Sequence, residues 1–167
     1  MDARSESESG PSTFKSHTTS ERKSDRELVV TRTVNAPARI VFEAWTTPEL
    51  LLRWWAPKSF GVAFLSCEAD VRVGGTYRFV FAHPVTKEPM AFFGRYLEVT
   101  PHSRVVWTND ESGDAGQVST LTLEDLGDTT RAVLHEVYPS AAALAASAGA
   151  YDGMPESFEQ LDAILAG

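Results

Sequence analysis

Two charged side chains, Arg95 and Glu136, lie at positions where they could face the interior of the fold and contact a ligand. Arg95 follows Phe93 by two positions and Glu136 follows Leu134 by two, so in strands each would share an inward face with its apolar neighbour. A buried arginine needs an acidic partner, and Glu136 is the candidate. The pair would orient the polar end of a ligand, or a perturbed Glu136 would act as an acid or base. A structural ion pair, and a register in which one of the two is solvated, remain open.

Other reactive side chains show no catalytic or metal-binding spacing. His135 adjoins Glu136, so a strand would turn the two to opposite faces. The sequence has no His, Cys, Asp and Glu grouping spaced for a metal, and Ser119 and Ser157 lie outside any nucleophile-elbow pattern. We therefore predict no catalytic residue, no metal and no cofactor.

An aromatic sheet face is the main sign of a binding cavity. Tyr77, Phe79 and Phe81 alternate along one expected strand and therefore share a face. An aromatic concavity is a ligand site by default, although the same residues would equally fill a solid core. We expect this face to be joined by Phe93, Trp107, Leu121, Leu134 and Phe158.

The adjacent pair Trp54-Trp55 sits in an expected short helix. Neighbouring residues of a helix point about 100° apart, so the two rings do not reach one site together. We expect one ring to pack under the rim of the sheet and the other to close the mouth of the cavity. Packing of both rings in the core or rim is the alternative.

The elements that would position these residues are strands and a terminal helix. Alternating apolar residues predict strands at residues 27–34, 62–69, 76–82, 90–99, 105–109, 118–124 and 129–138. Short helices are expected after Pro37 and after Thr47. The last turns of the chain carry one apolar stripe, which needs a sheet to lie on. That stripe consists of Phe158, Leu161, Ile164 and Leu165.

Composition divides the chain into a tail and one domain. Residues 1–26 hold ten Ser/Thr and equal numbers of acidic and basic side chains, which predicts a disordered tail. It would be a regulatory or partner-binding arm, or simply a solvating leader. Residues 27–167 are of a size and composition suited to a single domain.

Charge and cysteine content exclude several classes of function. The net charge of −8 falls entirely within residues 27–167, where basic side chains do not cluster, so nucleic-acid binding is not expected. No apolar run is long enough for a membrane span or a signal peptide. A single cysteine, Cys67, cannot form an internal disulfide. We therefore expect a cytoplasmic protein.

The chain resembles the activator of heat-shock protein 90 ATPase homologues, a family of the START/Bet v 1-like (SRPBCC) superfamily. The resemblance covers about residues 27–165 and implies an α+β helix-grip fold, in which a curved antiparallel sheet of six to seven strands wraps a long C-terminal helix. A cavity between sheet and helix is also implied. The residues that carry the likeness are Val34-Asn35-Ala36-Pro37, Val41-Phe42, Trp45, Pro48-Glu49-Leu50, Trp54-Trp55, Gly74-Gly75-Thr76-Tyr77, Gly94-Arg95-Tyr96-Leu97-Glu98-Val99, Val105-Val106-Trp107, Gly153-Met154, Ser157 and Leu161.

The resemblance implies a function only as a class. Cavities of this superfamily often bind lipids, polyketides or other apolar small molecules, so we expect an apolar small-molecule ligand. One alternative is a cyclase or dehydratase that uses pocket carboxylates or Arg/Glu pairs in the same cavity, which requires Arg95 and Glu136 to line it. Another is a co-chaperone-like module that stimulates a chaperone ATPase, and a homodimer contact is also open. A fold-level likeness does not decide among these.

Overall fold

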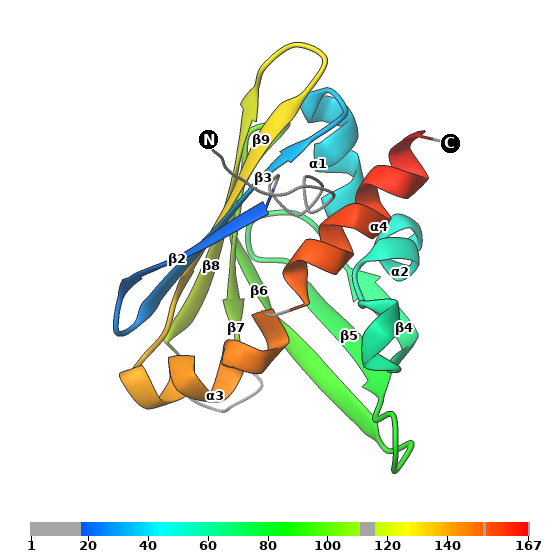
Figure 1. Cartoon of the computed structure of the whole chain (residues 1–167), viewed down its shortest axis with the longest axis vertical. Coiled ribbons are helices and arrows are strands. Elements are labelled where there is room, and N and C mark those ends of the chain that lie inside the picture. The colour runs from blue at the N-terminus through cyan, green and yellow to red at the C-terminus, as the bar shows by residue number, and fades with distance from the viewer. Residues whose placement is uncertain (1–17, 111–115, 152, 167) are drawn as a thin grey trace, which may run out of the picture.

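The computed structural model describes residues 18–110, 116–151 and 153–166 (Figure 1). Its strands form one antiparallel sheet in the order β2-β3-β9-β8-β7-β6-β5-β4. The strands are β2 (Thr18–Ser24), β3 (Glu27–Val34), β4 (Ala63–Ala69), β5 (Thr76–Ala82), β6 (Pro89–Thr100), β7 (Arg104–Asn109), β8 (Gln117–Asp125) and β9 (Thr130–Val137). The helices are α1 (Ala38–Thr46), α2 (Pro48–Trp54), the 3-10 helix η3 (Lys58–Phe60), α3 (Ala141–Tyr151) and α4 (Met154–Ala166).

The architecture is the predicted α+β helix-grip fold. Figure 1 shows α4 lying across the sheet beside α2, and α4 contacts both α2 and β3. The short helices α1 and α2 meet at Thr47, which ends one and begins the other. Pro48 occupies the first turn of α2, where its missing N–H removes no helical hydrogen bond. Because α4 lies on the sheet, these two elements form the two walls between which the site lies.

Strand β2 brings the number of strands in the described part of the chain to eight, whereas we predicted six to seven. We expected residues 18–24 to be part of a disordered tail, yet they pair with β3 from Thr18↔Arg32 to Ser24↔Glu27. Most side chains of β2 are exposed, so backbone pairing rather than apolar burial holds it in place. Composition alone therefore missed it. The predicted disorder of residues 1–17 lies outside the described residues.

The C-terminal helical region consists of two pieces. Helix α3 ends at Tyr151 and α4 begins at Met154, directly after Gly153. A Cβ atom at Gly153 would lie 2.6 Å from Cγ of Pro57 and 2.8 Å from Cζ of Phe60. The chain therefore comes too close to the segment after α2 for a larger residue at this position. The long C-terminal helix that the resemblance implies is thus present as two helices, α3 and α4.

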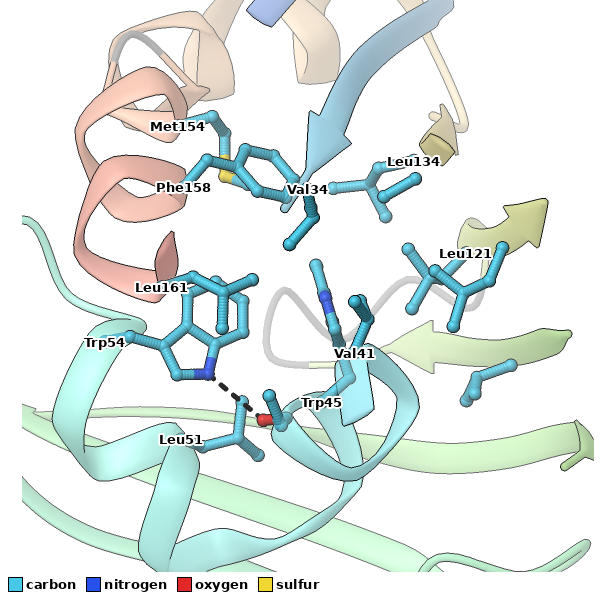
Figure 2. Close-up of a cluster of buried hydrophobic side chains, with 14 of the residues drawn as sticks. Val34, Val41, Trp45, Leu51, Trp54, Leu121, Leu134, Met154, Phe158 and Leu161 are labelled. Carbon is cyan, nitrogen blue, oxygen red and sulfur yellow. Dashed lines mark hydrogen bonds between the residues drawn. The ribbon is translucent and has the colours of Figure 1, made fainter. Parts of the chain in front are cut away.

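Aromatic and aliphatic side chains from α1, α2 and α4 form the core beside the sheet (Figure 2). Phe158 and Leu161 of α4 are fully buried, with Phe158 6.3 Å from the ring of Trp54. The indole nitrogen of Trp54 donates a 3.0 Å hydrogen bond to the carbonyl of Ala44 in α1. The apolar stripe of α4 thus meets the sheet and both short helices, as its spacing requires.

A partly buried ion pair joins α4 to the sheet. Arg32 of β3 is only 2% exposed, and its Nη2 donates to Oδ2 of Asp162 on α4. Its Nη1 donates a 2.7 Å bond to the hydroxyl of Thr18 in β2. Asp162 also accepts a bond from the backbone N–H of Asn35. One guanidinium therefore connects the edge strand, the sheet and the last helix.

Candidate functional site

A cavity of about 290 Å³ lies between the inner face of the sheet and the first turns of α4. This volume is close to the lower end of small-molecule pockets. A second chamber of about 30 Å³ shares Trp55, Tyr77, Phe79 and Trp107 with it. The larger cavity is lined by Trp55, Ala56, Pro57, Phe60, Val62, Tyr77, Phe79, Phe81, Met90, Phe92, Trp107, Asn109, Gln117, Ser119, Leu134, Glu136, Met154 and Ser157.

The predicted aromatic face of β5 is the central wall of this cavity. Tyr77, Phe79 and Phe81 alternate along the strand and all turn inward. The ring of Trp55 lies 6.1 Å from that of Phe79 in an edge-on contact. The predicted residues that line the larger cavity are Trp55, Tyr77, Phe79, Phe81, Trp107, Leu134 and Glu136, whereas Leu121 lines the smaller chamber.

The tryptophan pair divides as its helical spacing predicts. Trp54 is fully buried in the core and lines neither cavity, whereas Trp55 lines both. Phe158 also packs in the core, 6.2 Å from the ring of Trp45, rather than on the cavity wall. Trp54 and Phe158 therefore pack in the core next to the site and do not line either cavity.

The predicted inward placement of Arg95 and Phe93 is wrong. The inner face of β6 carries Phe92, Gly94 and Tyr96, so Phe93 and Arg95 point outward. The side chain of Arg95 is 53% exposed and forms a 3.4 Å ion pair with Asp110 instead of Glu136.

The aromatic residues of β6 explain this error. Phe92 and Phe93 are adjacent, so either alternation of β6 places an aromatic ring on the inner face. Pairing to β5 decides between them, because it sets Gly94 opposite the inward Tyr77. On the outer face, the Arg78 guanidinium lies 5.9 Å from the ring centre of Phe93.

Glu136 does face the cavity, where it accepts hydrogen bonds in a polar network that we did not predict. Nδ2 of Asn109 donates a 2.8 Å bond to Oγ of Ser119, and Ser119 donates to Oε1 of Glu136. Nε2 of Gln117 also donates to Oε1, at 3.4 Å. The Tyr77 hydroxyl lies 2.7 Å from the carbonyl of Thr108 and 3.2 Å from Oδ1 of Asn109.

Strand alternation contained a signal for this network. Gln117, Ser119 and Leu121 share one face of β8, and Leu121 was placed inward by prediction. The register sets Ser119 directly opposite Glu136 of β9. The inward face that holds Leu121 therefore also holds Gln117 and Ser119. Strand alternation predicts this much, whereas the pairing of Ser119 with Glu136 depends on the register between β8 and β9.

Residues 55–62, between α2 and β4, form the rim of the cavity and are called the rim segment below. Side chains of α4 form hydrogen bonds to this segment. Ser157 donates a 2.9 Å bond to the carbonyl of Trp55, and Gln160 donates one of 2.9 Å to that of Ala56. Glu156 accepts bonds from both the backbone N–H and the hydroxyl of Ser59. These two bonds from Ser59 hold the pKa of Glu156 below its usual value.

Two further titratable groups near the site, Cys67 and Tyr96, have raised pKa values. Burial, with a smaller contribution from Glu49 and Glu68, raises the pKa of the Cys67 thiol to about 12. Burial also raises the pKa of Tyr96. Within the described part of the chain, His, Cys, Asp and Glu side chains do not gather in a group able to hold a metal ion. No helix there has the length and apolarity to cross a membrane.

The protein has an antiparallel sheet packed on a C-terminal helix, short helices between β3 and β4, and a cavity between the sheet and α4. These features define a helix-grip protein of the START/Bet v 1-like superfamily. More narrowly, the chain belongs to the family described as Activator of Hsp90 ATPase homolog 1-like protein, whose model matches residues 35–166. Members of this family typically have a ligand-binding cavity.

Solved structures share this fold. A protein from Rhodobacter sphaeroides is 23% identical with a TM-score of 0.79, over 89% of this chain and 97% of its own. One from Nitrosomonas europaea is 24% identical with a TM-score of 0.76, over 87% and 97%. One from Chromobacterium violaceum is 28% identical with a TM-score of 0.69, over 84% and 97%. A search of curated proteins finds no match to this chain.

Proposed function

We propose that the protein binds a small apolar or aromatic molecule, of the lipid or polyketide kind, between the sheet and α4. The observation that carries the proposal is the cavity of about 290 Å³, whose walls are mainly aromatic and aliphatic. Burial of apolar ligand surface against such walls contributes about 25 cal/mol per Å² before the costs of association. The sequence has one cysteine, Cys67, and the lack of a disulfide partner supports a reducing cytoplasmic location as part of this proposal.

The alternatives are less well supported. The cyclase or dehydratase hypothesis required Arg95 and Glu136 in one cavity, and Arg95 lies on the outer face of the sheet. The co-chaperone hypothesis rests on the description of the family alone. Ligand binding is therefore the function for which the geometry gives direct support.

The first test is binding of the neutral fluorescent probe N-phenylnaphthylamine to the purified full chain. Met90 lines the cavity, whereas Leu97 of the same strand is 43% exposed. Met90→Trp should fill part of the cavity and weaken probe binding about tenfold, equivalent to about 1.4 kcal/mol. Leu97→Trp should leave binding unchanged. Equal binding by both variants, with native unfolding curves, would count against this cavity as the site.

Native mass spectrometry of the protein from its own host, paired with a denatured measurement, identifies the class of ligand. A mass excess that is lost on denaturation is the expected result. An unmodified mass, together with no binding of N-phenylnaphthylamine, would overturn the proposal.

A further inference from the structure

We infer that the ligand carries a protonated amine on an aromatic or aliphatic body, and that the carboxylate of Glu136 receives this amine. The inference rests on the proposed binding function. It starts from the placement of Glu136, which is only 2% exposed and lines the larger cavity. Among the described residues lining that cavity, Glu136 is the one acidic or basic side chain. The polar end of the site therefore contains one acidic side chain.

The hydrogen bonds around Glu136 present its carboxyl group as an acceptor. Asn109 donates to the oxygen of Ser119, so the single hydroxyl proton of Ser119 is directed onward to Glu136. Gln117 donates to the same Oε1 atom. A carboxylate has about four acceptor positions, so it can take an N–H of a ligand in addition to bonds within the protein. A ligand group that hydrogen-bonds to this acceptor is therefore a donor.

Electrostatics favour a cationic donor over a neutral one. A carboxylate enclosed by apolar walls has lost water, and an opposite charge offsets that cost. A charge-assisted hydrogen bond is roughly twice as strong as a neutral one. The aromatic walls also attract cations through their ring faces, and Trp55, Tyr77 and Trp107 all line the cavity. An anionic ligand end, by contrast, would be repelled by an ionised Glu136.

The experiment compares three ligands of similar shape by displacement of N-phenylnaphthylamine from the full chain. These are naphthylmethylamine, neutral ethylnaphthalene and anionic naphthoate. The amine should bind about tenfold more tightly than ethylnaphthalene, the factor given by one hydrogen bond to a charged group. Naphthoate should bind more weakly than ethylnaphthalene. The isosteric Glu136→Gln variant should lose the preference for the amine, while Glu88→Gln, at an exposed loop position, should retain it.

The outcomes are distinct. Equal affinity for the three ligands in the unmodified chain, or an amine preference that persists in Glu136→Gln, would overturn the inference while leaving the proposed function in place. No binding of N-phenylnaphthylamine to the unmodified chain would overturn the proposed function as well. The three-ligand comparison in the unmodified chain decides the question even if Glu136→Gln does not fold.

Discussion

Ser119 and Glu136 are directly paired residues of β8 and β9, and the hydroxyl of Ser119 donates to the carboxylate of Glu136. Both side chains are buried, at 1% and 2% exposure. Because the two residues are cross-strand neighbours, the register of the sheet holds their hydrogen bond in place before any ligand arrives. The polar end of the cavity is thus a preorganised part of the sheet, not of a loop.

Ser119→Ala should destabilise the protein by about 1 to 3 kcal/mol. The substitution removes a buried donor from Glu136 and a buried acceptor from Asn109, and unsatisfied buried polar groups cost this much. Urea unfolding gives the change in free energy. Thr122→Ala, at an exposed position of the same strand, is the matched control and should change stability by less than about 0.5 kcal/mol. Similar effects of the two substitutions would contradict the network.

Substitution of Trp54 should mainly lower the stability of the fold, whereas substitution of Trp55 should mainly weaken ligand binding. Trp54→Phe removes the hydrogen bond to Ala44 and leaves a void in the core, for a loss of about 2 kcal/mol. Its effect on N-phenylnaphthylamine affinity should be small, since Trp54 lines neither cavity. Trp55→Ala should weaken probe binding about tenfold or more at a smaller cost in stability. A reversed pattern in unfolding and binding titrations would show that the roles are misassigned.

The sequence was sufficient for most of the sheet and for the inward placement of Glu136. Strict alternation placed Tyr77, Phe79 and Phe81 on one face because only one of the two faces of β5 is aromatic. The same rule failed for β6, where both Phe92 and Phe93 satisfy it. Only pairing to β5 resolves that choice, and pairing is a property of the assembled sheet.

Removing one partner of the Arg32–Asp162 pair should be costly. Asp162→Ala removes the carboxylate from a guanidinium that is 2% exposed, which predicts a loss of about 3 kcal/mol. Replacing both residues with apolar ones, as in Arg32→Met with Asp162→Leu, should recover much of that loss. Thermal and urea unfolding measure both changes. A double variant no more stable than Asp162→Ala would argue that Arg32 has a role beyond this pair.

Glu156 should make the rim segment sensitive to acid. Its pKa lies below the usual 4.5 in the folded protein, because Ser59 donates two bonds to the ionised form. The stabilisation is therefore fully present above pH 4.5 and is lost as the pH falls through the lowered folded pKa. Solvent screening keeps it below about 1 kcal/mol.

Unfolding of the unmodified chain and Glu156→Gln between pH 7 and pH 3 tests this, with the two expected to converge at the acid end. Ser59→Ala, which removes one of the two bonds, should show a smaller pH dependence than the unmodified chain. A difference between the unmodified chain and Glu156→Gln that stays constant with pH would contradict the role of the carboxylate.

The polar edge strand β2 has a consequence for self-association. A shortened chain starting at Glu27 would leave the N–H and C=O groups of β3 along that edge without their present partners. An uncovered edge rich in β-branched residues, such as Val29, Val30 and Thr31, is a template for pairing with a second copy. β2 covers that edge and itself presents Glu21, Arg22 and Lys23, charges that oppose further strand addition. The composition that made β2 look unstructured thus serves as a guard against edge-to-edge aggregation.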